Sequence, residues 1–184
     1  ENALKKKFVF NMEWDLERTD IPVVFTDKID WTYKPADDDE FIWAFNRHQF
    51  LVCLAQAYLI TGDEKYVTGY IDLITDFIDS QPIAPDNRMT TWRILEIGFR
   101  TEKWLKSLYM IKNSPQLTDT VLNKIYQSMR VHETTLLDEN SPYNYSTNRG
   151  VFANFGLFLY GCLLPHNDDT ARALHDSLLY LNRA

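Results

Sequence analysis

The stretch "FIWAFNRHQFLVCLAQAYLI", residues 41 to 60, is apolar on nearly every face when drawn as a helix, which predicts a helix buried on all sides. Residues 64 to 79 differ, because their apolar side chains form one stripe opposite a face of acids. That stripe consists of Val67, Tyr70, Ile71, Ile74, Phe77 and Ile78. The two segments therefore predict a helical hairpin with one buried and one half-exposed helix.

The same two patterns recur twice along the chain. "WRILEIGFRTEKWLKSLYMI" is broadly apolar and is followed by an amphipathic segment at 118–137. "VFANFGLFLYGCLL" is apolar all round, and residues 169–183 after it carry leucines on one side, namely Leu174, Leu178 and Leu181. We therefore expect three hairpins, whose first helices begin near residues 41, 91 and 148, at a period of roughly 50 residues.

Hairpins that pair a buried helix with an outer one stack as an α-solenoid or close into an α/α toroid. Three hairpins alone cannot close a ring, so the predicted fold class is all-α, with the helical hairpins of an incomplete α/α toroid over residues 41–184. Residues 1–40 are expected to be an irregular N-terminal segment with short extended stretches at "FVFNM" and "IPVVF". The acidic run "DDDE", residues 37 to 40, is expected to be a solvated cap of the next helix, with metal binding as the alternative.

The acidic character of the chain limits its partners. With 26 acidic against 19 basic residues the formal net charge is −7, which argues against non-specific binding to nucleic acid or to an anionic membrane surface. No apolar run approaches the length of a membrane-spanning helix. The chain begins at Glu1 and not at a methionine, which we interpret as removal of an N-terminal segment, so the lack of a signal peptide does not indicate the cytoplasm.

Neither the cysteines nor the histidines form a metal-binding pattern. Cys53 and Cys162 lie far apart in apolar helical patterns, and we expect both to be small core residues, with a disulfide as the alternative. We expect His48 and His132 in the core and two histidines on the surface, His166 and His175. Because no zinc, nucleotide or dinucleotide motif is present, no metal and no cofactor is predicted.

Charged side chains also fall within the mostly apolar segments, among them Arg47, Arg93, Glu96 and Arg100. Because burial of an unpaired charge is costly, they must pair with one another or face a wet cleft. Helical spacing places Trp43 beside Arg47, and Trp92 beside Glu96. An aromatic ring beside a guanidinium group can hold a sugar ring and its acidic substituent. Two interpretations therefore stay open, a carbohydrate-binding wall and an internal ion-pair network.

The polar stretch "SPYNYSTNRGVFANF", residues 141 to 155, runs into the third buried helix. Asn148 and Arg149 lie at the N-terminus of that helix, where backbone N–H groups and the helix dipole favour an anion. Asparagine is also a common N-cap. Asn148 is therefore either part of an anion-binding site or a helix cap.

Four blocks of sequence, "IDW", "FNRHQFLVCLAQAYLITGDEKY", "WRILEIGFR" and "NRGVFANFGLFLYGCLLP", resemble the N-terminal helical domain of the heparinase II/III family, and most of all the heparinase III type. The resemblance runs from about residue 29 to about residue 184. It implies an α/α toroid followed by an antiparallel β-sandwich domain, with the active cleft between the two. It also implies a lyase that cleaves acidic polysaccharide, such as heparan sulfate, by β-elimination without a nucleotide cofactor.

The resemblance implies roles for particular residues. It aligns Asn148 with the family's catalytic asparagine, which neutralises the uronic acid carboxylate, whereas Arg149 stands where heparinase III-like sequences commonly have histidine. The "NRH" of residues 46 to 48 would belong to a helix whose polar end lines the cleft, and would either bind substrate or hold the cleft wall. The substrate-binding residues expected on this basis are Trp43, Asn46, Arg47, His48, Trp92, Arg93 and Arg149.

The family's catalytic tyrosine and histidine would lie far beyond Asn148, and neither Tyr143 nor Tyr145 matches the tyrosine position. We therefore expect the 184-residue chain to be inactive by itself, and its missing β-sandwich domain to belong to the same polypeptide. A large polysaccharide substrate implies a periplasmic or secreted location.

Three alternatives differ from a lyase in class. The first is a non-catalytic carbohydrate-binding or structural helical domain, and the second is a helical-repeat scaffold for protein partners. The third is an α/α-barrel glycoside hydrolase, which needs a pair of carboxylates in its cleft. Glu96 is the only acid placed for that role, and an ion pair with Arg93 or Arg100 is the simpler assignment for it.

Overall fold

The computed structural model describes residues 1–11, 19–35, 39–139 and 147–183. After a 3-10 turn at Ala3–Lys5, strands β1 (Lys7–Phe10) and β2 (Thr19–Val24) pair antiparallel, with Phe8 opposite Val23. The helices that follow are α1 (Asp39–Asn46), α2 (Gln49–Thr61), α3 (Lys65–Ser80), α4 (Ile94–Ile111), α5 (Asp119–Asp138), α6 (Asn148–Leu163) and α7 (Asp168–Leu181), with a 3-10 turn at Pro85–Asn87 between α3 and α4.

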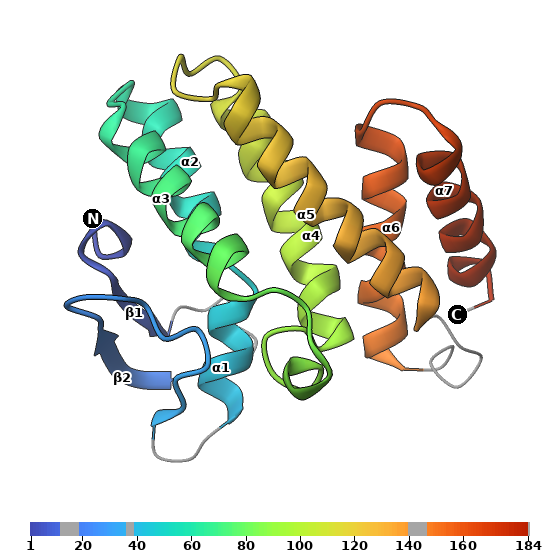
Figure 1. Ribbon diagram of the computed structural model, residues 1–184, viewed down its shortest axis with the longest axis horizontal. Helices are drawn as coiled ribbons and strands as arrows, with labels where there is room; N and C mark the ends of the chain where they lie inside the picture. Colours follow the sequence, from blue (N-terminus) through green and yellow to red (C-terminus); the bar gives the residue numbers. More distant parts are fainter. Residues whose placement is uncertain (12–18, 36–38, 140–146, 184) are drawn as a thin grey trace.

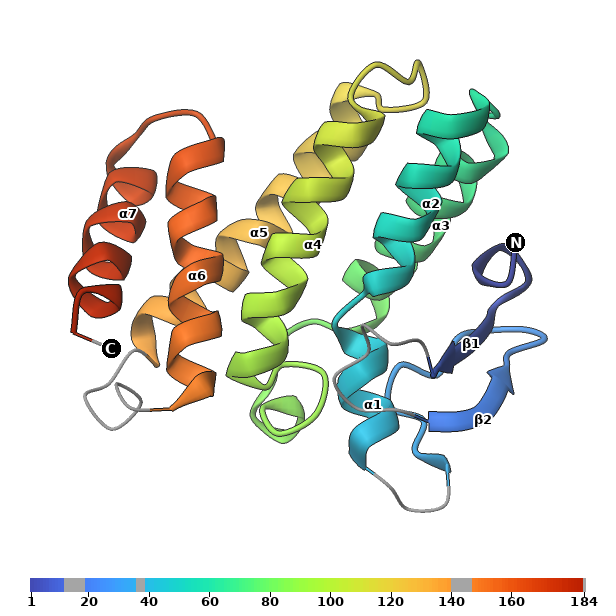
Figure 2. The same ribbon diagram turned by 180° about the vertical axis from the view of Figure 1, so that it is seen from behind.

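Three antiparallel helical hairpins, α2–α3, α4–α5 and α6–α7, lie side by side (Figure 1). In the reverse view α2, α4 and α6 form one layer, and α3 and α5 lie behind it (Figure 2). Helix α4 is the central one of that layer, because it packs against both α2 and α6. The predicted hairpins of an α/α toroid are therefore confirmed, and the extended stretches predicted near the N-terminus form a small sheet.

The N-terminal segment shares its core with the first hairpin. The ring of Phe45 on α1 is the centre of an aromatic cluster, with centroids 4.6 Å from Phe8 on β1 and 4.7 Å from Trp31. Phe50 at the start of α2 lies 5.9 Å from the same ring. Because such large side chains bury the most apolar area per residue, this cluster fixes the sheet against α1 and α2.

The prediction of one continuous helix over residues 41 to 60 is wrong, because the chain turns between α1 and α2. His48 adopts a left-handed backbone conformation with φ 60°, which an L-residue takes at a cost of about 1–2 kcal/mol. Tertiary contacts offset that cost. The His48 Nδ1 atom accepts a 3.0 Å hydrogen bond from Trp104 Nε1 on α4, and the ring packs edge-on against Phe77 at 4.5 Å.

The buried face of α7 also differs from the predicted leucine face. The residues buried on α7 are Thr170, Ala173, Ser177 and Tyr180, whereas Leu178 is 42% exposed. The reason is the close approach of α6, since a Cβ atom on Gly161 would lie 2.8 Å from the Thr170 carbonyl oxygen. Of the predicted leucines, Leu174 meets Gly161 through its Cβ atom and is half-buried, as is Leu181, so only Leu178 faces solvent.

The two cysteines were expected in the core, and this prediction is wrong as well. Cys53 on α2 and Cys162 on α6 are both exposed and neither forms a disulfide. Each lies on a helix whose outward side is itself apolar, as Leu59, Ile60 and Leu163 also show. When a helix is apolar on all faces, its sequence pattern therefore does not predict which of its residues are buried.

This exposure gives a first testable prediction. Both thiols should react with an aromatic disulfide reagent in the native protein, since both cysteines are exposed. The measurement is the thiol titre before and after denaturation. Equal titres are expected, and a titre that rises only on denaturation would show that the thiols are covered.

Candidate functional site

The site is formed where the N-terminal ends of α4 and α6 lie side by side, close to α1 (Figure 2). Helix α6 begins at Asn148, and its N-cap is Thr147, whose hydroxyl accepts a 3.2 Å hydrogen bond from the Gly150 amide. Asn148 is exposed and Arg149 is half-buried. Because Thr147 performs the capping, the cap interpretation of Asn148 is wrong, and its side chain lies in solvent at the positive end of a helix dipole.

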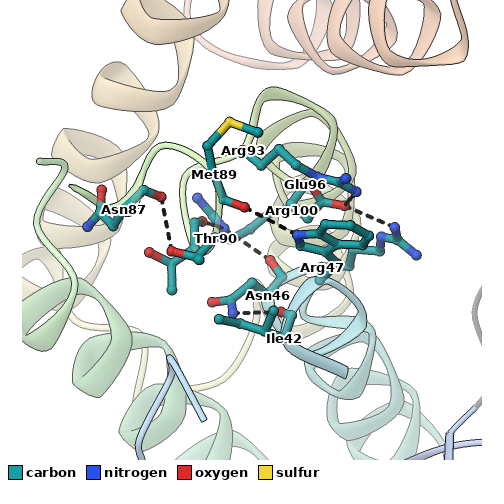
Figure 3. Close-up of polar contacts among 11 residues, drawn as sticks. Ile42, Asn46, Arg47, Asn87, Met89, Thr90, Arg93, Glu96 and Arg100 are labelled. Carbon is teal, nitrogen blue, oxygen red and sulfur yellow. Dashed lines mark hydrogen bonds and ion pairs between the residues drawn. The ribbon is translucent and has the colours of Figure 1, made fainter. Parts of the chain in front are cut away.

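A buried ion cluster joins α1 to the start of α4. Glu96 is completely buried and accepts hydrogen bonds from Arg47 Nη2 at 2.9 Å and from Arg93 Nη2 at 2.7 Å. The Arg93 guanidinium also lies 3.6 Å above the ring of Trp43, which is half-buried. Figure 3 shows Arg47 and Arg93 converging on Glu96. The internal ion-pair network, one of the two interpretations left open, is therefore present.

Arg100 takes no direct part in that cluster. Its Nη1 atom donates to the carbonyl oxygens of Asn46 and Thr91 at 3.0 and 2.8 Å (Figure 3 shows Arg100 beside Asn46). Its guanidinium carbon lies 4.6 Å from the centroid of the Phe77 ring and 5.0 Å from that of Trp92. Burial lowers the pKa of Arg100 to about 9, while Glu96 nearby opposes that effect, so Arg100 stays charged at neutral pH. Arg100 thus holds the turn after α1 against α4.

The remaining polar residues of the predicted site are inside the domain. Asn46 is fully buried, and its Nδ2 atom donates to the carbonyl oxygens of Trp31 and Ile42 at 3.0 and 2.8 Å. Trp92 precedes α4, and its Nε1 atom donates a 2.9 Å hydrogen bond to the backbone carbonyl oxygen of Gln81. Like His48, these side chains bond to other parts of the domain, which is the geometry expected of residues that stabilise the wall of a cleft. Direct substrate contact by the seven residues expected to bind substrate stays a prediction.

The residues that meet at this end of the molecule therefore divide into two groups. Asn148, Arg149 and Trp43 reach solvent, whereas Arg47 and Arg93 retain only 7% and 9% exposure. Sequence spacing could not separate these groups, because Arg47 lies beyond the end of α1 and Trp92 before the start of α4. The i, i+4 pairs Trp43–Arg47 and Trp92–Glu96 therefore do not lie on single helices, whereas Glu96 and Arg100 both lie on α4.

Two further residues were missed in the sequence. The first is Thr147, whose position three residues before Gly150 and just ahead of an apolar run is an N-cap signal. The second is Gly98, which allows α4 and α6 to touch, and nothing in the sequence distinguishes it from the other helical glycines. Tyr143 and Tyr145 lie outside the described residues, as do Asp37 and Asp38 of the acidic run. Asp39 and Glu40 of that run occupy the first turn of α1.

Within the described part of the chain, no group of three or more histidine, cysteine, aspartate or glutamate side chains could hold a metal ion. Among the same residues no helix is long and apolar enough to cross a membrane.

Two histidines are packed around Trp104 and Arg100 in the core. Burial, with the Arg100 charge as a second cause, lowers the pKa values of both His48 and His132 well below 6.5. His132 Nε2 accepts a 3.2 Å hydrogen bond from Arg100 Nε, which requires that nitrogen to be unprotonated. Both imidazoles are therefore neutral in the folded protein at neutral pH.

A pH-dependent loss of stability follows from these pKa values. A histidine whose folded pKa is depressed contributes stability above its unfolded pKa of 6.5, and this stability is lost as the pH falls below that value. The free energy of unfolding should fall by up to about 1.4 kcal/mol per pH unit for each histidine. Urea unfolding between about pH 7 and pH 5 measures it.

His132→Gln is the informative variant and His175→Gln its matched control, because His175 is exposed on α7. The His132 variant should show a shallower dependence of stability on pH, and the His175 variant the same dependence as the wild type. A wild-type stability that does not change over this range would contradict the assignment of two neutral buried histidines.

The comparisons with known proteins agree with this architecture. The chain matches the sequence model of the family described as "Heparinase II/III N-terminus" over residues 1–182. It is 30% identical over 139 residues to a heparin-sulfate lyase from Bacteroides thetaiotaomicron, covering 74% of this chain and 20% of that protein. To a heparin-sulfate lyase from Bacteroides stercoris it is 23% identical, covering 86% of this chain and 26% of that protein.

Solved structures share the fold. A crystal structure of heparan sulfate lyase HepC from Pedobacter heparinus superposes with a TM-score of 0.86 at 23% identity, over 98% of this chain and 27% of that one. A crystal structure of heparinase III gives a TM-score of 0.76 at 26% identity, over 83% of this chain and 23% of that one. The chain thus spans about a quarter of the length of these relatives. From its match over nearly all its residues, the chain belongs to the heparinase II/III family and corresponds to the N-terminal helical domain of that family.

Proposed function

We propose that this chain is the helical part of a polysaccharide lyase that cleaves a uronic-acid-containing polysaccharide, similar to heparin or heparan sulfate, by β-elimination. The observation that carries the proposal is the position of Asn148, exposed at the first residue of α6 and not engaged as its cap. The names of the relatives, heparin-sulfate lyases, support the choice of substrate class.

The chemistry explains why an asparagine amide suits this position. Removal of the C5 proton of a uronic acid leaves negative charge that spreads onto its carboxylate, so a hydrogen-bond donor must stabilise that group as the charge develops. The Asn148 amide is such a donor, and the positive end of the α6 dipole adds to its effect. Arg149, in the same helical turn, supplies a positive charge for a carboxylate or a sulfate.

The remaining chemical groups belong to other parts of the proposed enzyme. A base that takes the C5 proton and an acid that protonates the departing glycosidic oxygen are both required. We assign them to a tyrosine and a histidine of the longer polypeptide, and one wall of the cleft to its β-sandwich domain. The proposed location is periplasmic or secreted, where an acidic polysaccharide of this size is met.

One observation favours a second candidate, a non-catalytic carbohydrate-binding or structural helical domain. Most of the polar residues that were expected to bind substrate form hydrogen bonds or ion pairs inside the protein. In addition, the family resemblance puts Arg149 where heparinase III-like sequences commonly carry histidine. A domain that kept the fold without the reaction would retain these internal bonds. The two candidates differ in whether Asn148 takes part in a reaction.

Ultraviolet absorbance separates them, because β-elimination creates a carbon–carbon double bond conjugated with the uronate carboxylate. The assay compares the 184-residue chain with the full polypeptide that contains it, on heparan sulfate, on other uronic-acid polymers and on an uncharged glucan. Absorbance should rise only with the full polypeptide and only on a uronic-acid polymer. No rise on any such polymer, with a folded protein, would favour the non-catalytic candidate.

A further inference from the structure

We infer that α4 is a positioning element for Asn148, in which Gly98 sets the distance of closest approach to α6 and Phe99 fixes the first turns of α6 laterally. This inference rests on the proposed role of Asn148 and adds residues that never touch the substrate. It follows from how α4 and α6 meet at the end where Asn148 lies.

The two helices touch through their backbones at Gly98. A Cβ atom on Gly98 would lie 2.5 Å from the carbonyl oxygen of Phe152 and 2.9 Å from the Cα of Ala153. On the other helix, a Cβ atom on Gly156 would lie 2.8 Å from the Gly98 carbonyl oxygen. Backbone atoms cannot move aside as a flexible side chain can, so any side chain at Gly98 must push α6 away from α4.

The contact lies one helical turn from Asn148. Phe152 follows Asn148 by four residues, so the two lie on the same face of α6 and move together with its first turns. A displacement of the α6 backbone at Phe152 is therefore transmitted to Asn148 over about 6 Å of rigid helix.

A line of side chains holds the same turns in the lateral direction. The ring of Phe99 packs against that of Phe152, with centroids 4.2 Å apart and the ring planes tilted by 32°. The Arg47 guanidinium lies 5.1 Å from the Phe99 ring and is itself bound to the buried Glu96. Phe99 therefore contacts both the first turns of α6 and a cation that is itself held by a buried carboxylate.

Such positioning matters because a hydrogen bond that stabilises developing charge is sensitive to distance. A misplacement of about 1 Å remote from the chemistry can reduce a rate on the order of 100-fold. Loss of an interaction that forms only in the transition state lowers kcat and leaves KM nearly unchanged. A purely structural role of Gly98 would instead appear as loss of folded protein with normal kinetic constants in the folded fraction.

Gly98→Ala in the full polypeptide is the test, and Gly161→Ala is its matched control. The control adds a Cβ atom to α6 itself, on the side that faces α7, where it would lie 2.7 Å from the Leu174 Cβ and 2.8 Å from the Thr170 carbonyl oxygen. Gly161 also lies thirteen residues from Asn148, about 20 Å along the helix. We expect kcat to fall on the order of 100-fold for Gly98→Ala and to be nearly unchanged for Gly161→Ala, with similar KM values throughout.

Phe99→Leu is a second variant, which introduces no backbone clash. It tests the positioning of Asn148 if Gly98→Ala does not fold. It removes the ring that packs against Phe152 while keeping an apolar side chain. It should lower kcat by a larger factor than it changes KM. Equal kcat for the wild type and the folded variants at positions 98 and 99 would overturn the inference.

Hydrogen exchange of the 184-residue chain gives a readout that needs no activity. The amides of the first turns of α6 should exchange faster in Gly98→Ala and in Phe99→Leu than in the wild type, and at the wild-type rate in Gly161→Ala. Wild-type full polypeptide without lyase activity would refute the proposed function, whereas unchanged exchange in α6 would refute the positioning. The two failures are therefore distinguishable.

Discussion

Glu96→Ala should lower the free energy of unfolding of the 184-residue chain by about 3–5 kcal/mol, because it leaves buried guanidinium groups without their carboxylate. Arg47 and Arg93 both bind Glu96, and their side chains are only 8% and 11% exposed. Without the carboxylate between them the two cations repel each other at low dielectric constant. Urea unfolding followed by circular dichroism measures the change.

Asp79→Ala is the control for that experiment. Asp79 forms an ion pair of 2.6 Å with Lys124, but its side chain is 64% exposed. Exposed pairs contribute little, so this variant should change the free energy of unfolding by less than about 1 kcal/mol. Similar small effects for both variants would mean that the Glu96 cluster does not hold α1 against α4.

Asn148→Ala should lower kcat of the full polypeptide on the order of 100- to 1,000-fold, the usual effect of removing one donor that stabilises developing charge. The fold should be unaffected, because Asn148 is exposed and Thr147 caps the helix. Initial rates from ultraviolet absorbance, with thermal unfolding as a check on folding, measure the two properties separately. Asn123→Ala, which removes an exposed asparagine from the outer helix α5, is the matched control and should keep the wild-type kcat.

An Asn148→Ala variant with the kcat of the wild type would remove Asn148 from the mechanism. A variant that loses both folding and activity would assign Asn148 a structural role. Asn148→Asp adds a further arm, because a carboxylate in this position would repel the uronate carboxylate, and its kcat should be no higher than that of Asn148→Ala.

The hairpin architecture could be predicted from the sequence because burial acts on whole helices. A helix that is apolar on most faces is expected in the inner layer, and one with a single apolar stripe in the outer layer. These two patterns alternate three times, so the pairing of α2 with α3, α4 with α5, and α6 with α7 followed from pattern alone. The start of α6 was predicted near residue 148, where a polar stretch changes into an apolar run, and the helix does begin at Asn148.

The break between α1 and α2 could not be predicted, since its cause is a contact with another helix. His48 takes a left-handed conformation because Trp104, far along the chain, donates a hydrogen bond to its ring. The same limit applies to the buried face of α7, which depends on the absence of a side chain at Gly161. Local patterns specify what each helix can bury but not which neighbour approaches it.

The candidate site could be predicted only in part, because local sequence patterns do not show which elements meet in the fold. Asn148 is at a helix start, which is a local feature, and its exposure agrees with a role outside the core. The ion cluster of Arg47, Arg93 and Glu96 was one of two interpretations, and choosing between them needed the fold. The cluster joins α1 to the start of α4, so its burial depends on how these two elements meet.

A crystal structure of the full polypeptide with the unsaturated disaccharide product of the reaction tests the central claim most directly. The measured quantity is the distance from Asn148 Nδ2 to the nearest carboxylate oxygen of the uronate ring. We predict a hydrogen bond of about 3 Å, with the sugar lying across the N-terminal ends of α4 and α6. A disaccharide bound elsewhere, with Asn148 facing only solvent, would contradict the assignment of this end of the helical domain as the wall of a lyase cleft.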